Sequence, residues 1–247
     1  MLNELLLLSG NDIPFPAAQL VIHQPTISEI AYIGEEKFYT GCELLRFSKD
    51  NLTDEDKIHL INQTNFEILM SILNEKNPVT MQHKVCVIEL LSLLFPEYNI
   101  QLTLKGILFK KPNEEKEFII DNNNYENFLE IVNQMFVLER EGDKQEKFNP
   151  QGELAKKIAD KLKKGRQKVA AVAEKNQKVA IMSRYISILT VGLQKDMNSF
   201  MRYTVYQLFD EFKRYELKVN HDIYLQAKMA GAQNLKEVDD WMKDIHP

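Results

Sequence analysis

Residues 81–95 constrain the fold most, because apolar side chains recur on most sides of the helix that this stretch predicts. The apolar positions are Val85, Val87, Ile88, Leu90, Leu91, Leu93 and Leu94. Other elements have to enclose such a helix, so we expect it at the centre of an N-terminal core. Cys86 lies within it, where an unreactive buried thiol is expected. No disulfide with Cys42 is expected, since the sequence shows no secretory signal.

Two further helix starts are predicted in the N-terminal part. Thr26 and Glu29 have the spacing of a capping box, which predicts a helix that begins at Thr26. Thr53 predicts another start, because acidic residues follow it and an apolar stripe continues toward Pro78. The proline predicts the end of that helix.

The strands of the N-terminal part are expected to be short. Apolar runs at 5–8 and 20–23 predict two strands joined by a loop that contains several prolines. Lys111-Pro-Asn-Glu114 fits a type I turn, so a small antiparallel sheet is predicted around it, and another helix follows Asn124. The strands of this sheet are expected at 100–104, 107–109 and 118–120. A small N-terminal α+β domain is therefore expected within a mainly α protein.

The charged run at 139–147 marks the predicted domain boundary. We divide the chain into an N-terminal α+β domain at 1–140, a linker at 141–152 and a helical C-terminal region at 153–247. The fold class expected for the whole chain is mainly α (α+β), with the short antiparallel sheet and packed helices first and a helical extension after them.

A lysine-rich stretch opens the C-terminal region, with ten Lys or Arg residues between positions 155 and 184. A heptad register runs from Ile158 to Leu193, but Gly165 and Asn176 occupy core positions, and glycine costs a helix about 1 kcal/mol relative to alanine. We therefore expect a long helix that needs a partner surface. Its lysines either solvate the outer face, which is the favoured interpretation, or bind the phosphates of nucleic acid.

Three helices are expected in the last fifty residues. The first carries an apolar stripe from Val205 to Tyr215, and the second is capped at Asn220 and ends at Gly231. The third begins at Asn234 and places on one side Val238, Trp241, Met242 and Ile245. Trp241 and Met242 either clamp this helix onto its own bundle or anchor a partner protein.

Composition and motifs favour a binding protein over an enzyme. The net charge of −5 disfavours general affinity for nucleic acid, and no apolar run approaches the roughly 20 residues that a membrane span needs. The five histidines are scattered and form no metal-binding spacing, and phosphate-binding glycine loops are absent from the sequence. No catalytic residue, cofactor or metal is therefore predicted.

Two stretches resemble a known protein family. One is the opening Gln24-Pro-Thr-Ile-Ser-Glu-Ile-Ala-Tyr-Ile-Gly-Glu35; the other is the ending that holds Asp210-Glu-Phe-Lys-Arg-Tyr215 and Val238-Asp-Asp-Trp-Met-Lys243. Together they resemble the tail assembly chaperones of long-tailed bacteriophages. The resemblance implies a non-enzymatic protein of the host cytoplasm that holds the tape-measure protein soluble while tail-tube subunits gather around it, and whose N-terminal domain self-associates or contacts tube protein.

The predicted partner-binding residues combine this resemblance with the apolar stripes of the C-terminal region. They are Ile158, Val169, Val172, Val179, Trp241 and Met242. Two alternatives stay open: a nucleic-acid-binding accessory protein that uses the lysine-rich stretch, and a permanent component of the virion tail.

Overall fold

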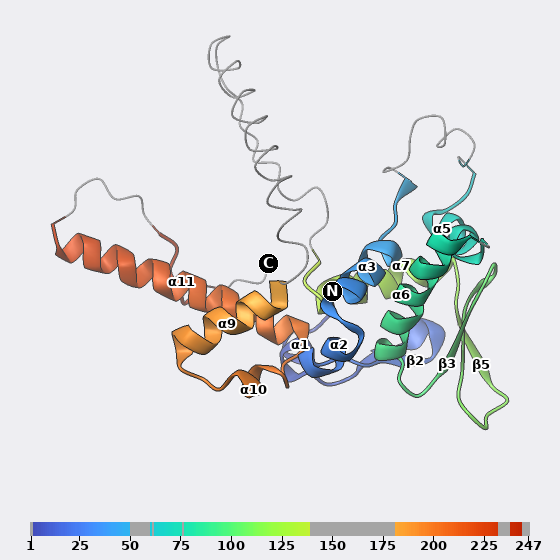
Figure 1. Cartoon of the computed structure of the whole chain (residues 1–247), viewed down its shortest axis with the longest axis horizontal. Helices are drawn as coiled ribbons and strands as arrows, with labels where there is room; N and C mark the ends of the chain where they lie inside the picture. Colours follow the sequence, from blue (N-terminus) through green and yellow to red (C-terminus); the bar gives the residue numbers. More distant parts are fainter. Residues whose placement is uncertain are drawn as a thin grey trace, which may run out of the picture.

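The computed structural model describes residues 2–49, 60, 62–75, 77–138, 181–231 and 238–243 (Figure 1). Its elements are α1 (Glu4–Ser9), β1 (Ile13–Phe15), η1 (Pro16–Ala18), β2 (Leu20–Ile22), α2 (Ile27–Ile33), α3 (Glu35–Leu45), α5 (Asn65–Asn74), α6 (Pro78–Leu94), β3 (Asn99–Thr103), β4 (Gly106–Lys110), β5 (Glu117–Ile120), α7 (Tyr125–Met135), α9 (Ile181–Leu193), α10 (Met197–Phe200) and α11 (Val205–Met229). Helices predominate, and the strands form two small antiparallel sheets. The predicted fold class, mainly α with a small α+β part, is confirmed.

The first apolar run forms the helix α1, so the strand predicted at 5–8 is wrong. Asn3 caps this helix by accepting a hydrogen bond from the Leu5 N–H, and Gly10 ends it with a left-handed φ of 70°. The strand predicted at 20–23 is confirmed as β2. It pairs with β1, which lies in the stretch predicted as a loop and places Ile13 opposite Ile22.

One face of helix α6 packs at the centre of the N-terminal core. Val87, Leu90, Leu91 and Leu94 are fully buried there, and α3 packs along them. On the opposite face Met81 and Val85 are 63% and 48% exposed. Ile88 and Leu93 also pack against the core, so the prediction of a central helix enclosed on most sides is correct, and one strip of the helix stays exposed.

The boundaries of α5 and α6 differ from the prediction. Thr64 and Glu67 form a reciprocal capping box, so the described part of the apolar stripe begins a helix of its own at Asn65. The predicted start at Thr53 lies outside the described residues. Pro78 occupies the first turn of α6, where a missing N–H costs nothing, and Asn77 caps that helix. The proline therefore begins a helix as well as following one.

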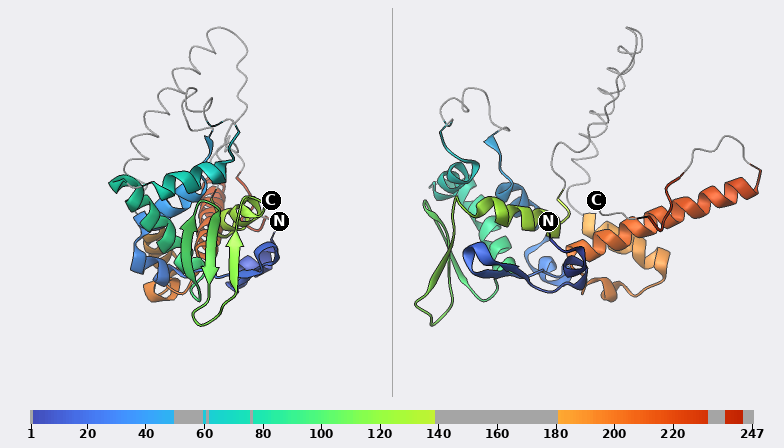
Figure 2. Two further views of the ribbon diagram at one scale, coloured as in Figure 1. Left: turned by 90° about the vertical axis from the view of Figure 1, so that its right-hand side faces the viewer. Right: turned by 180° about the vertical axis from the view of Figure 1, so that it is seen from behind.

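The predicted antiparallel sheet is present, with the strand order β3-β4-β5 (Figure 2). Its turn is of a different type from the one predicted. The Glu114 N–H donates to the Lys111 carbonyl at 3.2 Å, but Asn113 has a φ of 69°. A type I turn needs a negative φ at this third position, whereas a type II turn needs a positive one that asparagine tolerates.

A single helix, α11, replaces the two helices predicted between Val205 and Gly231. Thr204 and Gln207 form its capping box, and Asn220 lies inside it without ending it. Gly231 follows the helix end with the predicted left-handed conformation, at a φ of 85°. The third predicted helix is wrong for residues 238–243, which have no regular structure apart from a turn.

The C-terminal helices contact the N-terminal part directly. Thr26 and Thr204 form an isolated antiparallel bridge, and the Ile27 N–H donates to the Tyr203 carbonyl at 2.8 Å. Gln207 Nε2 donates to the Leu8 carbonyl at 2.7 Å. Buried side chains of α9, α10 and α11 belong to the same apolar cluster as those of the N-terminal elements. The linker predicted at 141–152 lies outside the described residues, and the division into two domains stays a prediction.

Candidate partner-binding surface

Helix α9 begins against the N-terminal part through a carboxylate of α3. Glu35 Oε1 accepts a hydrogen bond from the Met182 N–H at 2.7 Å, and Glu35 Oε2 lies 3.3 Å from Ser183 Oγ. A carboxylate at this position satisfies N–H groups that lack a helical partner and interacts favourably with the helix dipole. The start of α9 is therefore fixed by a residue about 150 positions earlier in the chain.

Aromatic packing then joins α9 to the first half of α11. The Tyr185 ring stacks on Phe212, with centroids 3.6 Å apart and an interplanar angle of 4°, and meets Phe209 edge-on. Near the end of α9, Gly192 lies so close to Tyr215 that a side chain at position 192 would overlap the tyrosine ring. The Lys195–Glu211 ion pair, at 2.9 Å, ties the following loop to α11.

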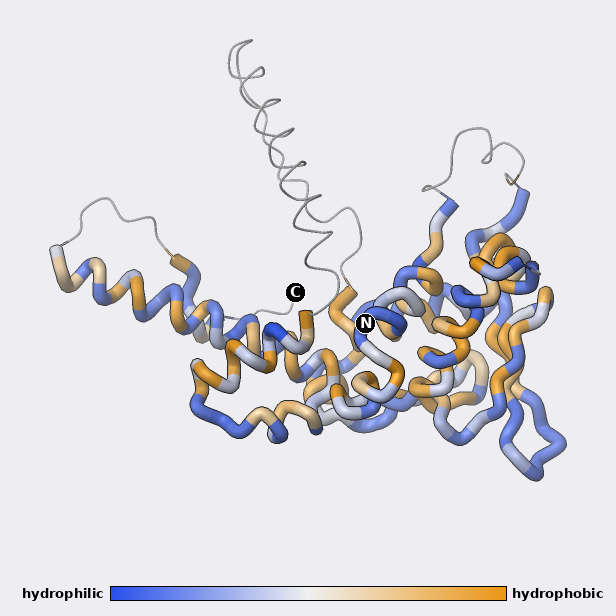
Figure 3. The backbone as a smooth tube through the Cα atoms, viewed as in Figure 1, coloured by the Kyte–Doolittle hydropathy of each residue, from blue (hydrophilic) through white to orange (hydrophobic). Residues whose placement is uncertain are grey.

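The apolar stripe of α11 continues past the end of α9. It repeats at steps of three and four residues through Val205, Leu208, Phe212, Tyr215, Val219, Ile223, Ala227 and Ala230. Val205 and Leu208 are buried, whereas Ile223 is 60% exposed, and Leu217 is the last buried residue of the helix. We call residues 219–230 the distal arm; it extends away from the other described elements (Figures 1 and 3).

The chain after α11 returns to that helix. Arg214 Nη1 donates to the carbonyls of Trp241, at 3.0 Å, and Lys243, at 2.6 Å. The Trp241 side chain is half-buried, and Met242 is 68% exposed. Two predicted partner-binding residues therefore lie beside α11, on the same module as the distal arm.

The other four predicted partner-binding residues, Ile158, Val169, Val172 and Val179, lie outside the described residues. Sequence reasoning missed the distal arm because Asn220 was interpreted as a helix cap. The signal that identifies the arm is the unbroken spacing of three and four residues from Tyr215 through Val219 to Ile223.

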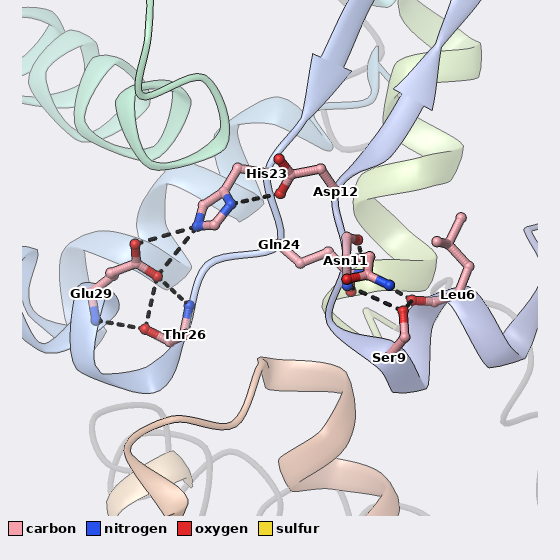
Figure 4. A network of polar contacts seen from close by, with 8 residues as sticks. All are labelled: Leu6, Ser9, Asn11, Asp12, His23, Gln24, Thr26 and Glu29. Carbon is pink, nitrogen blue, oxygen red and sulfur yellow. Dashed lines mark hydrogen bonds and ion pairs between the residues drawn. The ribbon is translucent and has the colours of Figure 1, made fainter.

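A second cluster of polar side chains surrounds His23 (Figure 4). The imidazole Nδ1 lies 2.8 Å from Asp12 Oδ1, and Nε2 lies 3.3 Å from Glu29 Oε1. The Thr26 hydroxyl donates to Glu29 Oε2 rather than to the ring, and the Gln24 side-chain amide donates to the carbonyls of Leu6 and Asn11. Carboxylates lie next to both ring nitrogens, so neither nitrogen is placed to activate a nucleophile. The cluster instead connects the start of α2, through Glu29, to the loop between α1 and β1, through Asp12.

The electrostatics of the titratable groups have simple causes. Burial raises the pKa of Glu29, but hydrogen bonds from the Thr26 backbone and hydroxyl, together with His23, outweigh this effect and lower the pKa below 4.5. Burial raises the pKa of both free thiols, Cys42 and Cys86, so neither is held as a thiolate.

Two searches within the described ranges concern metals and membranes. Among the residues that the structure describes, no group of three or more His, Cys, Asp or Glu side chains is placed to hold a metal ion. Within the same ranges, every helix is too short or too polar to cross a membrane.

Residues 174–246 match the family described as the YomV second domain. The match connects the C-terminal region with a phage-associated family. No curated protein and no solved structure matches the chain. The matched residues include α9, α10, α11 and the segment 238–243, so the distal arm lies within the matched range.

Proposed function

We propose that this protein is a non-enzymatic phage tail assembly chaperone, which binds the tape-measure protein in the host cytoplasm through the distal arm of α11. The observation that carries the proposal is the apolar stripe of α11, which is covered by α9 as far as Tyr215 and then continues to the exposed Ile223. The match to a phage-associated family and the resemblance of both chain ends to tail assembly chaperones support it.

The chemistry of the arm suits a helical client. An amphipathic helix of the client would lie along Val219, Ile223, Ala227 and Ala230, and the two alanines would allow the two helix backbones to approach closely. The stripe of the arm has only two side chains larger than alanine, Val219 and Ile223, so the contact with any one client segment should be weak and reversible. Weak contacts suit a protein that has to release its client when tail-tube subunits arrive.

Co-expression tests this function. The full chain is produced together with the tape-measure protein that the proposal names as its client, and the soluble yield of that protein is measured with and without the chain. We expect a clear increase with the wild type and its loss with Ile223→Glu, which places a charge in the apolar stripe. Leu225→Glu is the matched control, since Leu225 is 41% exposed and lies about 200° around the helix from Ile223.

If the soluble yield of the client is the same with Ile223→Glu as with the wild type, the distal arm is not the client site. Purified virions distinguish a chaperone from a permanent tail component, because a chaperone should be absent from finished particles. Detection of the chain in particles at a fixed stoichiometry would favour the structural alternative.

A further inference from the structure

Strand β5 forms one edge of the three-stranded sheet, and no other strand in the described part of the chain pairs with this edge. The direction of its backbone groups follows from the register. Gly106 closes the two-residue turn opposite Thr103, so alternate residues of β4, beginning with Ile107, direct their N–H and C=O groups toward β5. Their partners Ile120 and Phe118 point back toward β4. Glu117 and Ile119 therefore direct their backbone groups outward, away from the sheet.

One of these outward groups has a side-chain partner. Asn124 Nδ2 donates to the Ile119 carbonyl at 3.2 Å, which agrees with the outward direction of that carbonyl. Within the described part of the chain, no hydrogen bond engages the Glu117 N–H, the Glu117 C=O or the Ile119 N–H. These three groups are spaced to receive another strand.

A depression lies beside this edge. It is open, has a volume of about 500 Å³ and is bounded by β5 and η1, which contact each other. Its apolar lining includes Ala17, Ala18 and Phe118, and Lys116 Nζ crosses it to donate to Gln19 Oε1 at 3.0 Å. Lys116 and Gln19 are both exposed, so an incoming chain can replace this contact.

Charge determines what kind of strand fits. The edge and its flanks carry the acids Glu114, Glu115, Glu117 and Asp121 and the base Lys116, while Lys110 of β4 forms an ion pair with Glu117 at 3.6 Å. Antiparallel pairing of two β5 strands centred on Phe118 would place Glu115 opposite Asp121, and a shift of one residue would place Glu117 opposite itself or Asp121. Like charges directly opposite each other are unfavourable, so a second copy of this edge is a poor partner.

We infer that the edge of β5 binds an extended basic segment of a partner protein by adding it as a fourth strand. Alternate residues of such a segment face opposite sides of the sheet. Small apolar residues would contact Ala17, Ala18 and Phe118, while Lys or Arg residues between them would meet Glu115 and Asp121 and share Glu117 with Lys110. This surface is separate from the distal arm, which lies at the opposite end of the molecule (Figures 1 and 2).

The test uses the full chain and an eight-residue peptide of alternating lysine and valine with blocked ends. Binding is measured by calorimetry and by amide hydrogen exchange. In the free protein, the Glu117 and Ile119 amides should exchange faster than those of Phe118 and Ile120, and the peptide should slow them. A peptide with glutamate in place of lysine, and one with alternate backbone nitrogens methylated, should bind much more weakly.

Two variants separate the backbone contribution from the charge contribution. Ile119→Pro removes an outward N–H, and proline is tolerated at such an edge position, so binding should be lost while the sheet persists. Glu117→Lys should weaken binding about fivefold, as expected for one cross-strand charge pair. Glu75→Lys makes the same charge change at the exposed C-terminal end of α5 and should leave binding unchanged.

Unchanged binding in Glu117→Lys, or equal binding of the methylated peptide, would overturn the inference. Sedimentation that shows dimers abolished by Ile119→Pro would also overturn it, because a second copy would then occupy the edge. Ile223→Glu should bind the peptide normally, so failure at this edge and failure of the distal arm are distinguishable.

Discussion

At the scale of single residues, Gly41 sets the distance between α3 and α6. A Cβ at this position would lie 2.9 Å from the Cys86 carbonyl oxygen and 3.0 Å from the Leu90 Cβ. Replacing a helical glycine by alanine ordinarily stabilises a helix by about 1 kcal/mol. Here we expect Gly41→Ala to lower the free energy of unfolding by about 1–3 kcal/mol, because α3 has to move away from α6. Denaturant unfolding measures the change, and a stabilised variant would contradict this packing.

Glu29 gives the start of α2 a dependence on pH. Its pKa in the folded protein lies below the ordinary value of 4.5, so ionised Glu29 stabilises the fold fully above that value. This contribution is lost as the pH falls through the lowered pKa. Glu29→Gln should therefore reduce the loss of thermal stability between about pH 5 and 3. Glu126→Gln, at an exposed position of α7, is the control, and identical pH profiles for Glu29→Gln and the wild type would exclude this role.

The sequence predicted the structural role of a residue correctly where that role depends on one nearby residue. Thr26 and Glu29 form the expected capping box because both partners lie within one helical turn. The turn at Lys111 was placed correctly but typed wrongly, since a proline in the second position suits type I and type II turns alike. The positive φ of Asn113, which decides between the two types, is not fixed by the proline.

At the scale of elements, Arg214 holds the segment 238–243 against α11. Its Nη1 atom donates to both the Trp241 and the Lys243 carbonyls. Arg214→Ala should release this segment and expose Trp241, the only tryptophan of the chain. We expect a red shift of the fluorescence emission and stronger quenching by acrylamide. Lys218→Ala changes an exposed residue of the same helix as a control, and an unchanged spectrum for Arg214→Ala would show that other contacts hold Trp241.

Elements were misassigned where a local pattern allowed two structures. The run Leu5–Leu8 suits either a helix or a buried strand, because so short an apolar run has no distinguishing period. Asn220 is a good helix cap but costs a helix interior less than 1 kcal/mol, so the surrounding helix continues through it. Because of this second ambiguity, the distal arm was not predicted. The depression beside β5 was not predicted either, because η1 forms one of its sides and no local pattern in the sequence indicates that η1 lies beside β5.

At the scale of the whole molecule, apolar contacts connect the N-terminal elements with α9, α10 and α11. Limited proteolysis should cut the chain first between 139 and 152, as the charged run there predicts. We expect the two fragments to elute together in gel filtration, because buried side chains such as Leu208 and Met182 hold them in one core.

A variant with a charge in the shared core is compared with the wild type in this experiment. Leu208→Asp should cost several kcal/mol and separate the fragments after cleavage. Separate elution of the wild-type fragments would instead show that residues 1–140 form an independent domain. The sequence alone offered no means of foreseeing this contact, since Thr26 and Thr204 are 178 positions apart and no local pattern pairs them.

The buried first half of α11 gives the distal arm the mechanics of a lever. Leu208 and Leu217 are buried and the Tyr185 ring stacks on Phe212, so the fulcrum lies near Leu217, where the burial ends. The 12 residues of the arm span about 18 Å, and a bend of about 10° at the fulcrum would carry the tip through about 3 Å. A bend of this size would move the tip relative to a bound helix while the packed half of α11 stays in place.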